Sequence, residues 1–144
     1  MADTSTRQGI LSVEDCWDLL RGQEFGRLAY VIDGAPAIAP INYVVDQNQL
    51  VFRTADGTKL HSMLADPRVA FEVDKIDSDQ EIGSSVVVRG EAYVLSADEE
   101  YRIEQVGLRA WLGQDRPVLI AIRPAEVTGR RYHLKRPWKR MMRG

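Results

Sequence analysis

The sequence predicts a mainly β, α+β domain: a small antiparallel barrel of six strands with flanking helices. Short apolar segments separated by turn residues predict consecutive hairpins, and they lack the regular strand–helix alternation of a parallel sheet. A long strand with Gly90 near its centre is typical of a bulge or bend at a barrel corner. The chain has 144 residues, 44% hydrophobic and 28% charged, which suits one soluble domain.

The N-terminal third is predicted to form a helix and a hairpin. Ser12 followed by two acidic residues marks a helix start and Gly22 marks its end, which gives a helix over residues 13–21. Alternating apolar residues predict a strand over residues 26–32. The Asp33-Gly34 pair that follows is typical of a tight hairpin turn.

The second hairpin is predicted from strands over residues 37–45 and 49–54, joined by the polar turn 46–48. Pro40 lies inside the first of these strands and has no backbone N–H to donate to a neighbour. It therefore indicates a sheet edge, a bulge, or a place where a ligand lies against the strand. An edge strand without a ligand explains the proline equally well.

The remaining elements follow from the same patterns. They are a short helix over residues 58–64, a strand over 69–74, a polar loop over 75–83, a strand over 85–95, a helix from Ser96 to about residue 112, and a strand over 118–122 that resumes at Val127. Ser96 and Glu99 have the spacing of a capping box. Pro124 predicts an interruption of the last strand.

Groups that favour an anion gather between strand 49–54 and the short helix. Arg53 and Lys59 offer charged donors, Thr54 and Thr58 offer hydroxyls, and the glycine at position 57 permits a tight turn. A helix that begins near Thr58 also directs free backbone N–H groups to the same place. The pattern predicts a phosphate site. The alternative is that both cations are solvated charges at an ordinary strand–helix junction.

Composition excludes several other kinds of site. The single cysteine, Cys16, cannot form an intramolecular disulfide and is predicted to be a small core residue. His61 and His133 are far from it in sequence, which argues against a metal site. The polar N-terminus and the absence of a long apolar run predict a cytoplasmic protein that is not in a membrane.

Charge is unevenly distributed along the chain. The net charge is −2, yet seven of the 19 basic residues and none of the 21 acidic residues follow residue 128. Such a tail could bind nucleic acid or a membrane surface, or fold against the acidic body of its own chain or of a second subunit. The acidic body and the few aromatic residues in the tail argue against nucleic acid.

Seven segments, in this order and spacing, resemble the pyridoxamine 5′-phosphate oxidase-like family of the flavin-binding split β-barrel superfamily. They are LSVEDCWDLL, FGRLAY, PAIAPINYVVD, LVFRTADGTKL, PRVAFEVDKID, SSVVVRGEAYVL and VTGRR. The resemblance implies a six-stranded split β-barrel domain over residues 11–132, preceded by a flexible segment 1–10 and followed by a basic tail 133–144. It also implies a homodimer that binds FMN in a cleft between its subunits.

The resemblance also assigns nine residues to the cofactor. They are Pro40, Ile41, Asn42 and Tyr43 along the isoalloxazine ring, Arg53, Thr54, Thr58 and Lys59 at the phosphate, and Arg89 on the long strand. Backbone groups of Ile41 and Asn42 are expected to meet the polar edge of the ring. Ser84 stands where many relatives have a tryptophan, which alters one wall of the expected pocket.

The function that this resemblance implies is that of an FMN-dependent oxidoreductase acting on a small molecule. The cofactor would perform the redox chemistry, so no catalytic side chain is assigned. One alternative is a deazaflavin-dependent reductase on the same fold. A second is a non-enzymatic flavin- or haem-binding module. The sequence does not indicate the substrate.

Overall fold

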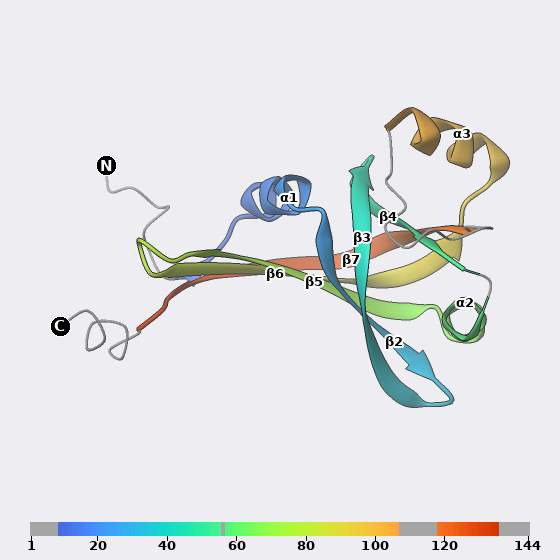
Figure 1. Cartoon of the computed structure of the whole chain (residues 1–144), viewed down its shortest axis with the longest axis horizontal. Coiled ribbons are helices and arrows are strands. Elements are labelled where there is room, and N and C mark those ends of the chain that lie inside the picture. The colour runs from blue at the N-terminus through green and yellow to red at the C-terminus, as the bar shows by residue number, and fades with distance from the viewer. Residues whose placement is uncertain (1–8, 56, 107–117, 136–144) are drawn as a thin grey trace.

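The computed structural model describes residues 9–55, 57–106 and 118–135 of the chain. Within them, three helices and seven antiparallel strands form an α+β fold (Figure 1). The strands are β1 (Gly9–Ile10), β2 (Phe25–Ile32), β3 (Ala35–Asp46), β4 (Gln49–Thr54), β5 (Arg68–Asp77), β6 (Ile82–Val94) and β7 (Val118–His133). The helices are α1 (Val13–Gly22), α2 (Thr58–Ala65) and α3 (Ala97–Val106).

Six of these strands close into a ring. The sheet order is β1-β7-β4-β3-β2-β5-β6, and β6 also pairs with β7, so the sheet returns on itself as an unevenly round barrel. The predicted antiparallel barrel is therefore confirmed. The two-residue strand β1, which is too short to leave a periodic pattern, adds to the edge of β7.

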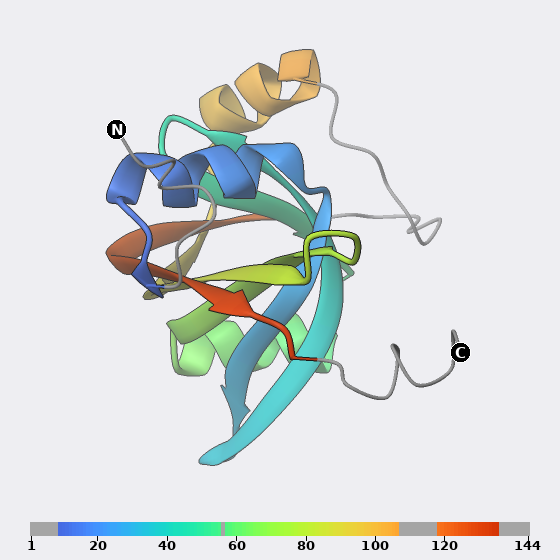
Figure 2. The same ribbon diagram turned by 90° about the vertical axis from the view of Figure 1, so that its left-hand side faces the viewer.

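The helices complete two hydrophobic cores. The barrel interior contains buried side chains from α1 and α2, among them Trp17, Leu20, Leu60 and Met63. Figure 2 shows α1 (blue) and α2 (green) on opposite sides of the barrel. A second, smaller core lies where Ile103 of α3 packs with residues of β4 and β7. None of the helices in the described ranges is long and apolar enough to span a bilayer.

The barrel is split between β3 and β4. The two strands pair only over residues 43–46 of β3, whereas β2 pairs with β3 as far as Asn42. Beyond Tyr43↔Phe52, β4 continues beside β7 to Thr54. Pro40 thus lies in a strand that is internal in the sheet order, but in a stretch that pairs with a neighbour only on its β2 side. The sheet edge that the sequence suggested at Pro40 is therefore local: this stretch of β3 is unpaired on its β4 side.

Two predicted elements in the C-terminal half were wrong in extent. The loop expected over residues 75–83 is shorter, because backbone pairing of β5 with β6 continues to Asp77↔Ile82 although the exposed side chains there show no apolar alternation. The last strand runs through Pro124 without interruption. The bulge predicted at Gly90 is present, as the register shifts between Arg89↔Glu126 and Gly90↔Pro124 and absorbs one residue of β7.

Some expectations fall outside the described residues. These are most of the N-terminal segment 1–10, the end of the predicted helix beyond Val106, and the basic tail beyond residue 135.

Candidate cofactor site

The predicted phosphate site begins where β4 leaves β3. Leu50 and Phe52 belong to the barrel interior, while Val51 belongs to the outer core under α3. Because side chains alternate along a strand, Arg53 shares the outer face of Val51, and Thr54 shares the inner face of Phe52. Thr54 is accordingly only 3% exposed. These two neighbours in sequence therefore direct their side chains to opposite faces.

Arg53 carries an unsatisfied donor. Its Nε is buried and has no hydrogen-bond partner, and Arg53 forms no ion pair within the described residues. Leaving a buried donor unpaired costs about 1–3 kcal/mol, and more when the group is charged. An anion that accepts a hydrogen bond from this guanidinium would remove that cost.

Further donors lie at the start of α2, which follows β4 after a short connection. The helix is capped by Gly57, which has no side chain to accept from the first backbone N–H groups, and its first turn contains no acidic residue. Thr58 is exposed at this end. Lys59 is half-buried, and burial lowers the pKa of its ammonium group below the ordinary value. An anion beside Lys59 would favour the charged form.

The segment expected along the cofactor ring has an inner and an outer face. Ile41 and Tyr43 point into the barrel, and the Tyr43 hydroxyl donates to the backbone oxygen of Leu20 at 2.5 Å. Burial raises the pKa of that phenol. Pro40 and Asn42 are more accessible and belong by alternation to the outer face. Tyr43 therefore supports the strand from within and does not offer its ring to a ligand on the outer face.

The backbone of this segment is partly free. Tyr43 N–H donates to the oxygen of Glu24 at 3.0 Å, on the β2 side. Regular alternation then directs the N–H of Asn42 toward the opposite, open side of β3. The Asn42 side chain is held separately, because its Nδ2 donates to Glu24 O at 3.0 Å. Main-chain groups at Asn42 are thus available to a ligand in the split.

Arg89 lies apart from these residues. It is an exposed residue of β6 and pairs with Ala70 on β5. Across the sheet, Ala70 pairs with Ala29 on β2, and Ala29 pairs with Ile38 on β3. Three strand spacings separate β6 from β3, which corresponds to about 14 Å. Within one copy of the chain, Arg89 is therefore not placed beside the Pro40–Asn42 backbone. It lines a different groove, of about 570 Å³, on the outer face of β2, β5 and β6.

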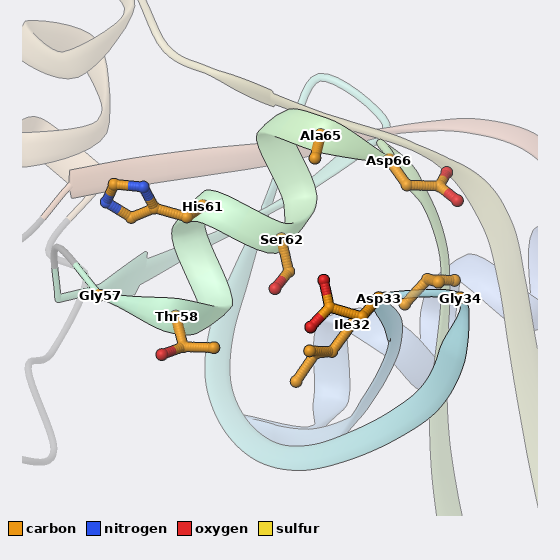
Figure 3. Close-up of a pocket in the computed structure, with 10 residues that line it drawn as sticks. Ile32, Asp33, Gly34, Gly57, Thr58, His61, Ser62, Ala65 and Asp66 are labelled. Carbon is orange, nitrogen blue, oxygen red and sulfur yellow. The ribbon is translucent and has the colours of Figure 1, made fainter.

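A groove beside α2 was not predicted from the sequence. A groove of about 610 Å³ lies between α2 and the tip of the β2–β3 hairpin, and it includes Gly57 and Thr58 (Figure 3). Its walls come from residues 31–34 and 57–66. Neither segment alone carries a motif for such a groove. In the described part of the chain, no group of three or more His, Cys, Asp or Glu side chains could hold a metal ion.

Comparison with known proteins identifies the family of this chain. The family model of pyridoxamine 5′-phosphate oxidase matches residues 12–131. The uncharacterized protein Rv0080 of Mycobacterium tuberculosis is 32% identical over 124 residues, which are 83% of this chain and 82% of that protein. Residues 12–131, which the family model matches, include the split between β3 and β4 and the start of α2.

Two solved structures are similar over nearly the whole chain. The FAD-binding protein from Mycobacterium smegmatis has 36% sequence identity and a TM-score of 0.72, with 86% of this chain and 99% of that chain covered. A FAD-binding protein from Mesorhizobium loti has 26% identity and a TM-score of 0.75, with 87% and 98% covered. The extent of the family match, together with the split barrel, means that this chain belongs to the pyridoxamine 5′-phosphate oxidase family.

Proposed function

We propose that the protein is a flavin-dependent oxidoreductase that acts on a small molecule and binds FMN by its phosphate at the junction of β4 and α2. The observation that carries this proposal is the buried, unpaired Nε of Arg53. A guanidinium in this position is suited to a phosphate oxygen, which accepts charged hydrogen bonds. The start of α2, where no side chain accepts from the backbone N–H groups, and the partly desolvated Lys59 supply further donors to the same ester group.

The ring of the cofactor would lie along the open stretch of β3. Pro40 and Asn42 present the outer face there, and the Asn42 N–H can donate to a polar edge of the ring. Tyr43 and Ile41 fix the strand from the barrel interior. The bound flavin would supply the hydride or electron transfer, while the chain's residues bind it, orient it and exclude water. No side chain is needed as an acid or base.

A homodimer would explain how Arg89 could contact the cofactor although it lies far from β3 within one chain. Because Arg89 is about 14 Å from β3 by strand spacing, it would meet a ligand at β3 only from a second copy of the chain. The outer face of the sheet between Arg89 and β3 carries the small side chains of Ala29 and Ala70. Ile38 on the same face is 70% exposed. Small residues permit close approach of a partner, and the exposed isoleucine would be buried. The cleft between two copies would then hold the ring.

The test of this function has two steps. We expect the purified protein to bind FMN, with an oxidised-flavin absorption spectrum in the complex. The loaded protein should then consume reduced cofactor faster with a nitro compound or a quinone as electron acceptor than without one.

Binding of a deazaflavin coenzyme with no binding of FMN would replace the cofactor assignment with the reductase alternative. Flavin binding without turnover of any acceptor would contradict the enzymatic proposal and favour a binding module. Binding of neither cofactor would overturn the proposed function.

A further inference from the structure

Helix α3 packs on the outer face of β4, which is the face that carries Arg53. Ile103 of α3 is buried there in the smaller core, together with Val51 of β4 and Leu119 of β7. Arg53 lies two residues after Val51 on the same face, and Leu119 is its register partner on β7. The side chain of Arg53 therefore begins at the edge of the core that α3 completes.

Polar contacts hold α3 on the β3–β4 hairpin. Arg102 of α3 donates from Nε and Nη2 to Oδ2 of Asp46, at 3.0 and 2.7 Å, and we call this ion pair the clasp. The hydroxyl of Tyr93 lies 2.7 Å from Oε1 of Gln49 and 3.2 Å from Oε2 of Glu99 on α3. Asp46 and Gln49 lie on either side of the β3–β4 turn, and Figure 1 shows α3 beside this end of the hairpin.

The acidic partner of the clasp is shielded from water. The Asp46 side chain is 11% exposed, whereas that of Arg102 is 39% exposed. A shielded carboxylate that loses its partner is destabilised until water reaches it. Without Arg102, movement of α3 away from the hairpin would hydrate Asp46, but it would also open the core that Ile103 fills. The clasp therefore favours the packed position of α3.

We propose that α3 positions Arg53 for the phosphate, and that the clasp holds α3 in the position where it does so. The inference rests on the proposed function, because Arg53 is the phosphate-binding residue there. With α3 packed, the stem of Arg53 is fixed at the edge of the core, so its unpaired Nε is held in place before an anion binds. With α3 displaced, the side chain gains rotamers, and their loss on binding lowers affinity. Arg102 and Asp46 are positioning residues, because they act through Arg53.

Reciprocal coupling gives a test that needs no turnover. If packed α3 favours the binding of FMN, bound FMN must favour packed α3 to the same extent. We expect saturating FMN to slow backbone hydrogen exchange in α3, measured by mass spectrometry on the full chain. Riboflavin, which lacks the phosphate, should not slow this exchange. Saturating FMN should not slow it in Arg53→Ala.

Titration with FMN and riboflavin separates positioning from a general loss of structure. Arg102→Ala should weaken the binding of FMN roughly tenfold, which is about 1.4 kcal/mol, and leave riboflavin affinity unchanged. Arg102→Lys keeps the positive charge and should lose less. In Arg53→Ala, the added change Arg102→Ala should weaken FMN no further, because the residue through which it acts is gone.

Tyr101→Ala is the control, because Tyr101 is next to Arg102 on α3 and is 69% exposed. It should leave both affinities and the exchange rates unchanged, and far-UV circular dichroism verifies that each variant is folded. Four results would each overturn this inference and leave the proposed function intact: FMN affinity unchanged in Arg102→Ala, a loss shared with riboflavin, additive losses in the double variant, or α3 exchange that riboflavin slows as much as FMN. FMN affinity that is unaffected by Arg53→Ala would instead overturn the phosphate assignment of the proposed function, and this inference with it.

Discussion

The close contact of β6 and β7 at the bulge predicts that Gly90→Ala destabilises the protein. A Cβ built on Gly90 would lie 2.0 Å from the backbone oxygen of Arg123, 2.9 Å from its carbonyl carbon and 3.1 Å from Cα of Pro124. All three are backbone atoms of a paired strand, so no side chain can rotate away to make room. The two strands must separate at the bulge.

Overpacking of a tight site typically costs about 1–3 kcal/mol. Because the obstacle here is backbone, we expect Gly90→Ala to lower the free energy of unfolding by about 3 kcal/mol. That would be a large fraction of the roughly 5–15 kcal/mol of an ordinary domain. Urea denaturation followed by circular dichroism measures it as a fall in the midpoint.

Gly22→Ala is the matched control. Gly22 is the last residue of α1, and a Cβ built on it would meet nothing within 4 Å. Because alanine favours a helix over glycine by about 0.8–1.0 kcal/mol in a helix interior, the same substitution should be neutral or stabilising there. If Gly90→Ala were as stable as the unmodified protein, the close approach of the Arg123 backbone to Gly90 at the bulge would be wrong.

Three further predictions concern single groups. Tyr43→Phe removes the donor to the Leu20 oxygen and should lower the free energy of unfolding by about 1–3 kcal/mol, measured with urea; a loss below about 0.5 kcal/mol would show that the carbonyl finds another donor. Hydrogen bonds from Arg68 lower the pKa of Asp66 from 3.8 to about 2, so its contribution to stability should be complete above about pH 4 and lost as pH falls toward 2. Asp66→Asn should remove that part of the acid dependence, and an unchanged pH profile would contradict it. Burial raises the pKa of the Cys16 thiol, so a disulfide reagent at pH 8 should react slowly with the native protein and quickly in urea; fast native reaction would show that the thiol is accessible.

Local signals predicted much of this fold. Ser12 begins α1 as expected, since its Oγ accepts from the Asp15 N–H at 3.1 Å. The Asp33-Gly34 turn has positive φ at both residues, as a tight hairpin requires. These features depend on a few adjacent residues, so their sequence carries the information.

Features that depend on distant pairing were missed or misjudged. Pro124 reads as a strand breaker, yet the unpaired residue of the bulge opposite Gly90 lets β7 continue. Residues 75–77 lack apolar alternation, but their backbone pairs with residues 82–84 beyond the barrel core. Ladder hydrogen bonds between strands leave no periodic pattern in such exposed sequences.

The same distinction applies to the candidate site. Arg53 and Lys59 could be proposed from sequence because they flank a single strand–helix junction. The inward side chain of Tyr43 and the groove between Asp33 and Ser62 could not, since they depend on which face each strand presents and on contact between two segments far apart in sequence.

The central claim is that the β4–α2 junction binds the phosphate of a flavin, and a paired titration tests it most directly. FMN and riboflavin differ only in that phosphate. We expect Arg53→Ala and Lys59→Ala each to weaken the binding of FMN by about 1.5–3 kcal/mol, because each removes a charged donor. This corresponds to a loss of affinity of roughly ten- to a hundredfold. Riboflavin affinity should be almost unaffected by either change.

Lys75→Ala is the control, because it removes an exposed lysine near the β5–β6 turn, at the end of the barrel away from α2 (Figure 1). FMN affinity that falls in both junction variants, with riboflavin affinity and the control unchanged, is the result that we predict. FMN binding that is indifferent to Arg53 and Lys59, or that falls together with riboflavin, would contradict the claim.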